Sequence, residues 1–146
     1  MTNQQWLLAK EFRFEAAHKL PHYNGMCARL HGHSWRGIVY IAGDALGESG
    51  AQQGMVIDFA EVEKYLKPLV ETYLDHNYLN ETLGLESPTS EKIAAWVYEK
   101  LESAGLPGLT AVRIEETCTS MCLYSKSRVN GWLNSNEGLS LLTSSR

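Results

Sequence analysis

The sequence lacks a long apolar run, a secretory leader and a disulfide framework. None of its hydrophobic segments approaches the roughly 20 residues that a membrane-spanning helix needs. The first residues also lack the basic segment and apolar stretch of a signal peptide. These absences predict a soluble, cytoplasmic protein that does not use a membrane.

Cysteine and positive charge are also scarce. Three cysteines cannot form a complete set of disulfides, and a chain of 146 residues can fold around a hydrophobic core without them. We therefore expect free thiols, with at least one open to chemistry. A formal net charge of -4 at pH 7 gives no basic surface of the kind that nucleic acid binding requires. An anionic ligand would have to be held by a few local groups.

The composition that remains is typical of one compact domain. Hydrophobic residues make up 44% of the chain, and no internal repeat or linker is visible. The C-terminal part is rich in Ser and Asn, and we expect it to be ordered only in part. We predict a single domain over residues 1–146, with a core at about residues 7–125 and a tail at about residues 126–146.

Alternation of polar and apolar side chains predicts strands, because side chains two apart share one face of a strand. The alternating segments are residues 11–18, 30–42 and 109–117, and residues 121–126 can supply a fourth strand.

Helical spacing of apolar residues occurs twice between the second and third of these strands. The first helix follows Asp58 and is expected to bend or break near Pro68. The second begins with a cap and a proline in its first turn, at residues 87–89, and ends at Gly105. The order β-β-α-α-β-β predicts an α+β fold, a four-stranded antiparallel sheet with both helices on one face. The open edges of such a sheet favour assembly into an oligomer.

The strongest chemical signal is a pair of histidines two residues apart. His31 and His33 project from one face of a strand, so both imidazoles can bind one ion, and His18 has the apolar parity to complete the set. Three neutral imidazoles leave the fourth tetrahedral position of Zn²⁺ open, as in a catalytic site. The alternative is three unrelated histidines, each of which then needs a partner of its own in the core.

Three other positions carry possible proton chemistry, and their spacing alone leaves alternatives. Cys27 precedes His31 by four residues. Three roles fit this position equally: a fourth metal ligand, a thiolate base or nucleophile, or an inert thiol. The pair Asp75 and His76 fits a histidine held by a carboxylate for proton transfer. Taken alone, the pair is more typical of a helix C-terminus, where a histidine suits the dipole.

Glu116 is unusual because it has the parity of an apolar face. It follows Val112 and Ile114 at two-residue spacing, which places a carboxylate on the core side of a strand. A core-facing carboxylate must be paired or held for a ligand, since burying it alone is costly. The alternative is a residue at the strand end that reaches solvent.

Together these segments resemble the successive motifs of the 6-pyruvoyl-tetrahydropterin synthase superfamily. They occur in matching order and span about residues 11–125. The motifs are FEAAH (14–18), CARLHGH (27–33), DF (58–59), LDHNYLN (74–80), PTSE (88–91) and ETCT (116–119).

The resemblance implies a tunnelling fold, with trimers around a barrel, two trimers stacked into a homohexamer, and active sites between subunits. It also implies a zinc enzyme, with roles assigned to seven residues. The implied zinc ligands are His18, His31 and His33, the implied catalytic set is Cys27, Asp75 and His76, and the implied anchor for the pterin is Glu116.

The spacing from Cys27 to His31 resembles that of the 6-carboxytetrahydropterin synthase branch. Pyruvoyl-forming enzymes of the superfamily usually carry two more residues between the cysteine and the histidines. That branch implies a lyase of queuosine biosynthesis acting on a pterin triphosphate, 7,8-dihydroneopterin triphosphate. The neighbouring alternative is a pyruvoyl-forming synthase of tetrahydrobiopterin biosynthesis. The short loop at residues 21–27 and the long tail after Lys126 depart from the family pattern.

Overall fold

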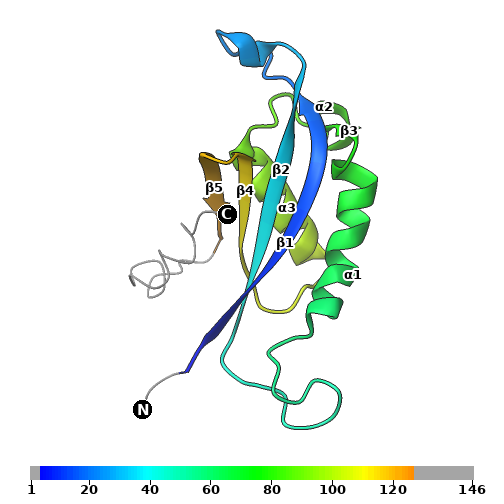
Figure 1. The fold of residues 1–146 in the computed structure, drawn as a ribbon, viewed down its shortest axis with the longest axis vertical. Coiled ribbons are helices and arrows are strands. Elements are labelled where there is room, and N and C mark those ends of the chain that lie inside the picture. Colours follow the sequence, from blue (N-terminus) through cyan, green and yellow to red (C-terminus); the bar gives the residue numbers. More distant parts are fainter. Residues whose placement is uncertain (1–3, 127–146) are drawn as a thin grey trace.

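The computed structural model describes residues 4–126, and in that part of the chain five strands form one sheet. The order across the sheet is β3-β1-β2-β4-β5 (Figure 1). All neighbours are antiparallel except β1 and β3, which are parallel. The strands are β1 (Trp6–His18), β2 (His31–Gly43), β3 (Asn77–Tyr78), β4 (Leu109–Thr117) and β5 (Ser120–Tyr124).

Helices α1 (Phe59–Leu69) and α3 (Ser90–Ser103) pack on the same face of the sheet (Figure 1). Each begins at a polar cap that satisfies a free backbone N–H. Asp58 accepts from the N–H of Ala60 at 2.9 Å, and Thr89 accepts from the N–H of Lys92 at 3.3 Å. The other helical segments are α2 (Leu79–Thr82), the 3₁₀ turn η1 (Met26–Ala28) and the π-helical turn η2 (Val70–Leu74).

The main hydrophobic core lies between this face of the sheet and the helices. Phe12 and Phe14 of β1 stack in a row that continues onto Trp35 of β2. Val62 of α1 and Ile93 of α3 are fully buried against the same cluster. Burying these large side chains supplies most of the driving force for folding. Every helix within residues 4–126 is too short or too polar to cross a membrane.

The opposite face of the sheet carries a smaller apolar cluster and a row of charged side chains. Arg36 donates to Glu11 at 2.9 Å and to Glu115 at 2.5 Å. Arg113 lies 3.2 Å from the same carboxylate of Glu115. Because Arg113 and Glu115 are each only 2% exposed, the pairing offsets a large cost of removing charge from water.

The prediction of a four-stranded, purely antiparallel sheet is wrong in detail. The pattern assigned no strand to the segment after the first helix, but Asn77 and Tyr78 form β3 and pair with Ala16 and Ala17 of β1. A strand of two residues is too short to show alternation in a sequence. The first strand also starts at Trp6, five residues before the predicted position, because the two long strands pair along their whole length.

The two predicted helices are confirmed, with one correction to the second. The predicted break near Pro68 occurs as the change from α1 to the π-helical turn η2, which begins two residues after the proline. Pro88 lies before the cap Thr89 and not in the first helical turn. Apart from Lys126, the predicted tail lies outside the described residues.

A tight contact across the two central strands gives a test of the fold. Phe12 pairs with Gly37, and a Cβ on Gly37 would lie 2.0 Å from Cζ of the Phe12 ring. We predict that Gly37→Ala lowers the free energy of unfolding by about 1–3 kcal/mol through overpacking. In a Phe12→Leu background the same change should cost less. Chemical denaturation of the four proteins measures both, and strictly additive effects would contradict this account.

Candidate functional site

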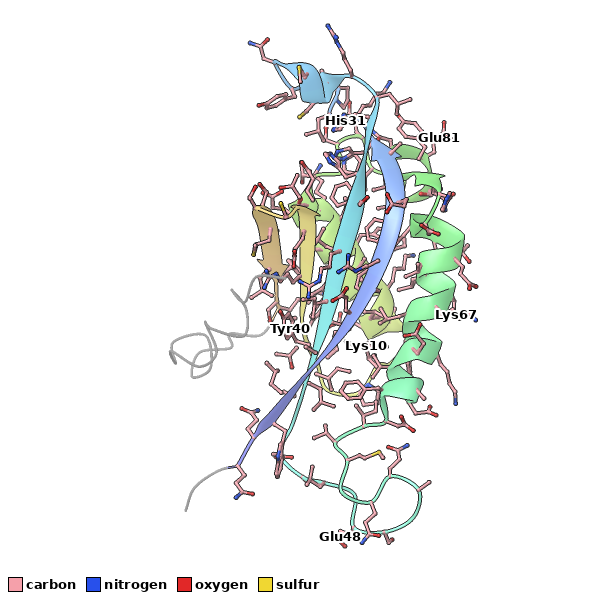
Figure 2. The ribbon with its side chains drawn as sticks, viewed as in Figure 1. Lys10, His31, Tyr40, Glu48, Lys67 and Glu81 are labelled. Carbon is pink, nitrogen blue, oxygen red and sulfur yellow. The ribbon has the colours of Figure 1, made fainter. Side chains whose placement is uncertain are left out.

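Three histidines meet where the two long strands enter and leave the loop at residues 19–30. His18 ends β1 and pairs with His31, which begins β2, while Ala16 pairs with His33. All three therefore project toward the same face of the sheet. One ring nitrogen from each lies within 4.8 Å of the others. Figure 2 shows His31 beside this loop, at the end of the sheet opposite Glu48.

Backbone carbonyls fix the ring orientations of two of these histidines. Nδ1 of His18 lies 2.8 Å from the carbonyl oxygen of Pro88, and Nδ1 of His31 lies 2.7 Å from that of Arg29. A carbonyl oxygen only accepts, so each Nδ1 carries the proton and each Nε2 has a free lone pair. The two Nε2 atoms face each other at 3.0 Å. Two lone pairs at this distance repel each other unless a proton or a metal ion lies between them, and a metal ion would be bound by both.

His33 completes the cluster from a more open side. Its Nε2 is buried, has no hydrogen-bond partner among the described residues, and lies 3.7 Å from Oε1 of Glu116. Burial lowers the pKa of His33 and of His18, although the nearby carboxylate of Glu116 opposes this in both. Lowered pKa values keep both rings neutral near neutral pH, which is the form that binds metal.

The aromatic side chain of Trp35 packs against two of the histidines. The ring of Trp35 meets those of His18 and His33 edge-on, with centroids 5.0 and 5.2 Å away. Its indole N–H donates to the carbonyl of Ala16 at 3.1 Å, so the ring itself is fixed. The site is therefore built on rigid strands and not on a loop.

Asp75 and His76 form a second candidate unit at the sheet edge. Nδ1 of His76 donates to Asp75 at 2.9 Å, and the other carboxylate oxygen of Asp75 accepts from the N–H of Glu15 at 2.8 Å. The Glu15 N–H and then the His76 ring hold the pKa of Asp75 below its usual range. His76 has a left-handed backbone, with φ at 56°, and its N–H bonds to the Glu15 carbonyl at 2.6 Å.

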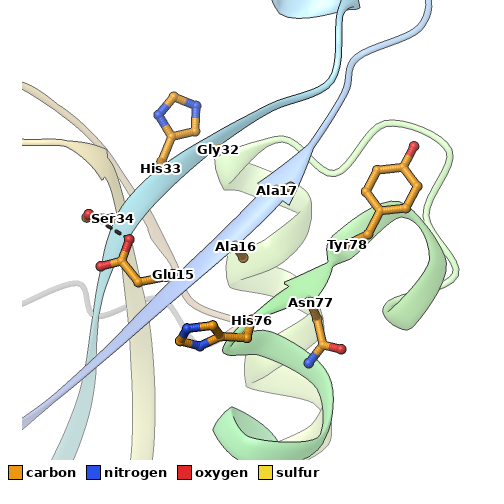
Figure 3. Close-up of a pocket in the computed structure, with 9 residues that line it drawn as sticks. All are labelled: Glu15, Ala16, Ala17, Gly32, His33, Ser34, His76, Asn77 and Tyr78. Atoms are coloured by element: carbon orange, nitrogen blue, oxygen red, sulfur yellow. Dashed lines mark hydrogen bonds between the residues drawn. The ribbon is translucent and has the colours of Figure 1, made fainter.

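One residue of each unit, His33 and His76, lines a pocket of about 460 Å³ (Figure 3). His33 comes from β2 and His76 immediately precedes β3, with β1 between these strands. The side chain of His76 is 80% exposed. The pair of Asp75 and His76 therefore faces outward from the sheet edge and not into the histidine cluster.

Two residues of this pocket were missed from the sequence. Glu15 bonds Asp75 and His76 through its backbone, and its side chain accepts from the hydroxyl of Ser34 at 2.7 Å (Figure 3). Alternation places Glu15 and Ser34 on the open face of the sheet, which is usually only solvated. Spacing gave no signal, because Glu15 and Asp75 lie 60 positions apart.

Cys27 lies in the 3₁₀ turn η1 and is half-buried. Among residues 4–126, the only group of three or more potential ligands close enough to hold one ion is the three histidines, and Cys27 is not part of it. The geometry of a single subunit thus gives no support to Cys27 as a fourth ligand. Oε1 of Glu116, in contrast, lies 3.7 Å from Nε2 of His33, a contact that its parity alone did not predict.

Comparison with known proteins decides the family. The family model of 6-pyruvoyl tetrahydropterin synthase matches residues 7–127. The chain belongs to the 6-pyruvoyl tetrahydropterin synthase family.

Relatives in this family agree along nearly their whole length. A protein of Synechocystis sp. named 6-carboxy-5,6,7,8-tetrahydropterin synthase is 58% identical, covering 86% of this chain and 97% of its own. A protein of the same name from Haemophilus influenzae is 31% identical over 82% of this chain and 98% of its own. The structure of Caenorhabditis elegans 6-pyruvoyl tetrahydropterin synthase superposes with a TM-score of 0.74 at 28% identity, covering 87% of this chain and 100% of its own.

The histidine cluster leads to a direct test of metal binding. We predict that His33→Ala loses more metal affinity than the roughly 10–100-fold typical of removing an outer-shell partner, because a ligand itself is gone. The metal content of dialysed protein measures this, with circular dichroism to check folding. His22→Ala is the matched control, since His22 pairs with Glu86 at 2.7 Å outside the cluster. Equal loss in both variants, or in neither, would contradict the assignment.

Proposed function

We propose that this protein is a zinc-dependent 6-carboxy-5,6,7,8-tetrahydropterin synthase of queuosine biosynthesis, a lyase that works in the cytoplasm. It converts 7,8-dihydroneopterin triphosphate and water to 6-carboxy-5,6,7,8-tetrahydropterin, acetaldehyde and triphosphate. The observation that carries the proposal is the approach of the Nε2 atoms of His18 and His31 to 3.0 Å, with each Nδ1 held by a backbone carbonyl, in a member of this family. The names of the relatives from Synechocystis and Haemophilus support the same reaction.

His18, His31 and His33 are the proposed zinc ligands. Three neutral imidazoles are a donor set that zinc favours, and they leave a fourth position for substrate. Bound there, zinc supplies Lewis acidity to the hydroxyl and carbonyl oxygens of the substrate side chain. The carbonyls of Pro88 and Arg29 hold two of the rings in the tautomer that this role needs.

Glu116 is the proposed anchor for the pterin ring. A carboxylate accepts two N–H groups side by side, and the amino-pyrimidine edge of a pterin offers such a pair. Glu116 lies 3.7 Å from His33, so a ring held by Glu116 extends its side chain toward the histidine cluster. This role is positioning, which sets the reacting carbon atoms in place without moving a proton.

Cys27, Asp75 and His76 are the proposed proton-transfer residues. Asp75 accepts the Nδ1 proton of His76, which leaves Nε2 free to give or take a proton. The hydrogen bond from the Glu15 N–H keeps Asp75 charged and fixed in orientation. Cys27 is the proposed base that removes a carbon-bound proton from the substrate as its side chain isomerises.

The outward position of His76 supports a site completed by a second subunit. We infer a homohexamer, a dimer of trimers, in which the Asp75 and His76 pair of one subunit serves the histidine cluster of a neighbour. The exposed His76 at the sheet edge fits this arrangement. Lys19 and Arg29, both exposed beside the cluster, are candidates to bind the triphosphate.

The alternative is a 6-pyruvoyl-tetrahydropterin synthase of tetrahydrobiopterin biosynthesis. The fold similarity to the Caenorhabditis elegans synthase of that name favours this candidate. The metal ligands and Glu116 suit both reactions, so the product must decide between them.

Product analysis tests the proposed reaction. We expect the zinc-loaded protein, given 7,8-dihydroneopterin triphosphate, to release acetaldehyde and form the 6-carboxy pterin, both identified by mass. Release of triphosphate with a pyruvoyl pterin and no acetaldehyde would establish the alternative. Tight zinc binding without any consumption of substrate would instead indicate a noncatalytic pterin or zinc-binding protein.

Removal of the Cys27 thiol separates the two roles considered for it. We predict that Cys27→Ala retains zinc and loses turnover by about 10²–10⁴-fold, as expected for a lost acid or base. Zinc content and acetaldehyde release are the two measurements. Cys118→Ala removes an exposed thiol and should change neither. If zinc is lost together with Cys27, the residue is a ligand and the assignment as a base is wrong.

A further inference from the structure

The side chain of Asn80 in α2 joins two segments that are distant in the sequence. Its oxygen accepts from the N–H of Lys19 at 3.0 Å, and its nitrogen donates to the carbonyl of Lys19 at 2.9 Å. The same nitrogen donates to the carbonyl of Glu86 at 2.9 Å. The nitrogen of a side-chain amide has two N–H donors, so these bonds use both of them and the oxygen as well.

Both segments hold the imidazole of His18. Lys19 directly follows His18, where β1 ends. Glu86 lies two residues before Pro88, whose carbonyl oxygen accepts from Nδ1 of His18 at 2.8 Å. The amide of Asn80 thus connects the backbone that carries the ring to the backbone that fixes its tautomer.

Asn80 takes the place that a neighbouring strand would occupy. Strand β3 pairs with β1 only at Ala16 and Ala17. Two residues further along, the N–H and carbonyl of Lys19 bond to the Asn80 side chain instead of to a backbone. The pairing is therefore extended past the end of β1, and the position of His18 is fixed on this side.

The backbone on the C-terminal side of Pro88 also holds its carbonyl in place. Thr89 follows Pro88 and caps α3, so the backbone beyond the carbonyl is held by a helix that packs in the core. On the side before Pro88, the described contacts include the bond from Asn80 to Glu86. The exposed side chain of Glu86 also bonds His22, and the N–H of Thr89 bonds the carbonyl of Ser87, so loss of the Asn80 bond would loosen this segment relative to His18 without freeing it.

We propose that Asn80 is a positioning residue of the metal centre, which sets the ring of His18 for its ion by holding Lys19 and Glu86 together. The inference rests on the proposed zinc site. It goes beyond that proposal because Asn80 lies among neither the histidines nor the proposed catalytic residues. Outer-shell groups that orient a ligand typically contribute 10–100-fold to metal affinity.

The test compares Asn80→Ala and Asn80→Asp with a matched control in the same short helix. Asn80→Asp keeps the size and one acceptor but cannot donate, and it places an oxygen against the carbonyls of Lys19 and Glu86. The control is Thr82→Val, which also removes a side chain that donates to the backbone, here the carbonyl of Tyr73 at 2.7 Å. That bond involves neither of the two segments that Asn80 joins.

The measurement is the Zn²⁺ dissociation constant by competition with a chromophoric chelator, at matched folded fractions. We expect both Asn80 variants to bind Zn²⁺ about 10–100-fold more weakly and Thr82→Val to stay within about twofold of the wild type. The visible absorption bands of Co²⁺ bound in place of Zn²⁺ should shift only in the Asn80 variants, because only their ligand geometry changes.

Three results would overturn the proposal. These are wild-type affinity in a folded Asn80 variant, an equal loss in Thr82→Val, or failure of both Asn80 variants to fold, which would make Asn80 a residue of general stability. The wild type separates this inference from the proposed function. If the wild type itself binds no Zn²⁺, the zinc assignment fails, whereas wild-type binding with unaffected Asn80 variants refutes only the role of Asn80.

Discussion

The antiparallel pairing of β1 with β2 is the interaction on which the rest of the structure depends. Its register places His18 opposite His31 and Ala16 opposite His33. Because side chains alternate between faces, a slip of one residue in either strand would turn its histidines to the other face. The buried row of Phe14 and Trp35, directly adjoining the histidines, prevents such a slip by requiring the same parity.

The two faces of the sheet carry different groups of side chains. The face covered by α1 and α3 holds the hydrophobic core and, at its end, the histidine cluster. The other face carries the pairing of Arg36, Arg113 and Glu115. Glu115 and Glu116 are neighbours in β4, yet one joins that charged row and the other lies beside His33. The period of two along a strand is the reason for this division.

Asp75 and His76, two of the residues proposed for proton transfer, are held by hydrogen bonds to Glu15 and not by a periodic element. Asp75 and His76 leave the π-helical turn η2, and the backbone of Glu15 fixes both of them at the sheet edge. Strain at the left-handed His76 is offset by its bond to that strand. The histidine cluster thus lies on two central strands, while the pair of Asp75 and His76 lies beside the short edge strand β3, with the His76 side chain exposed.

The sequence by itself determined the long strands, the capped helices, the shared face of the histidines and the core-side position of Glu116. These features follow from periods of two or 3.6 residues, which a hydrophobic face imposes on the chain. Only the tertiary structure decided the short strand β3, the holding of Asp75 by Glu15, and the bonds of Asn80 to Lys19 and Glu86. Each of these depends on a few hydrogen bonds, several of them between segments about sixty residues apart, and such bonds leave no periodic pattern in the sequence.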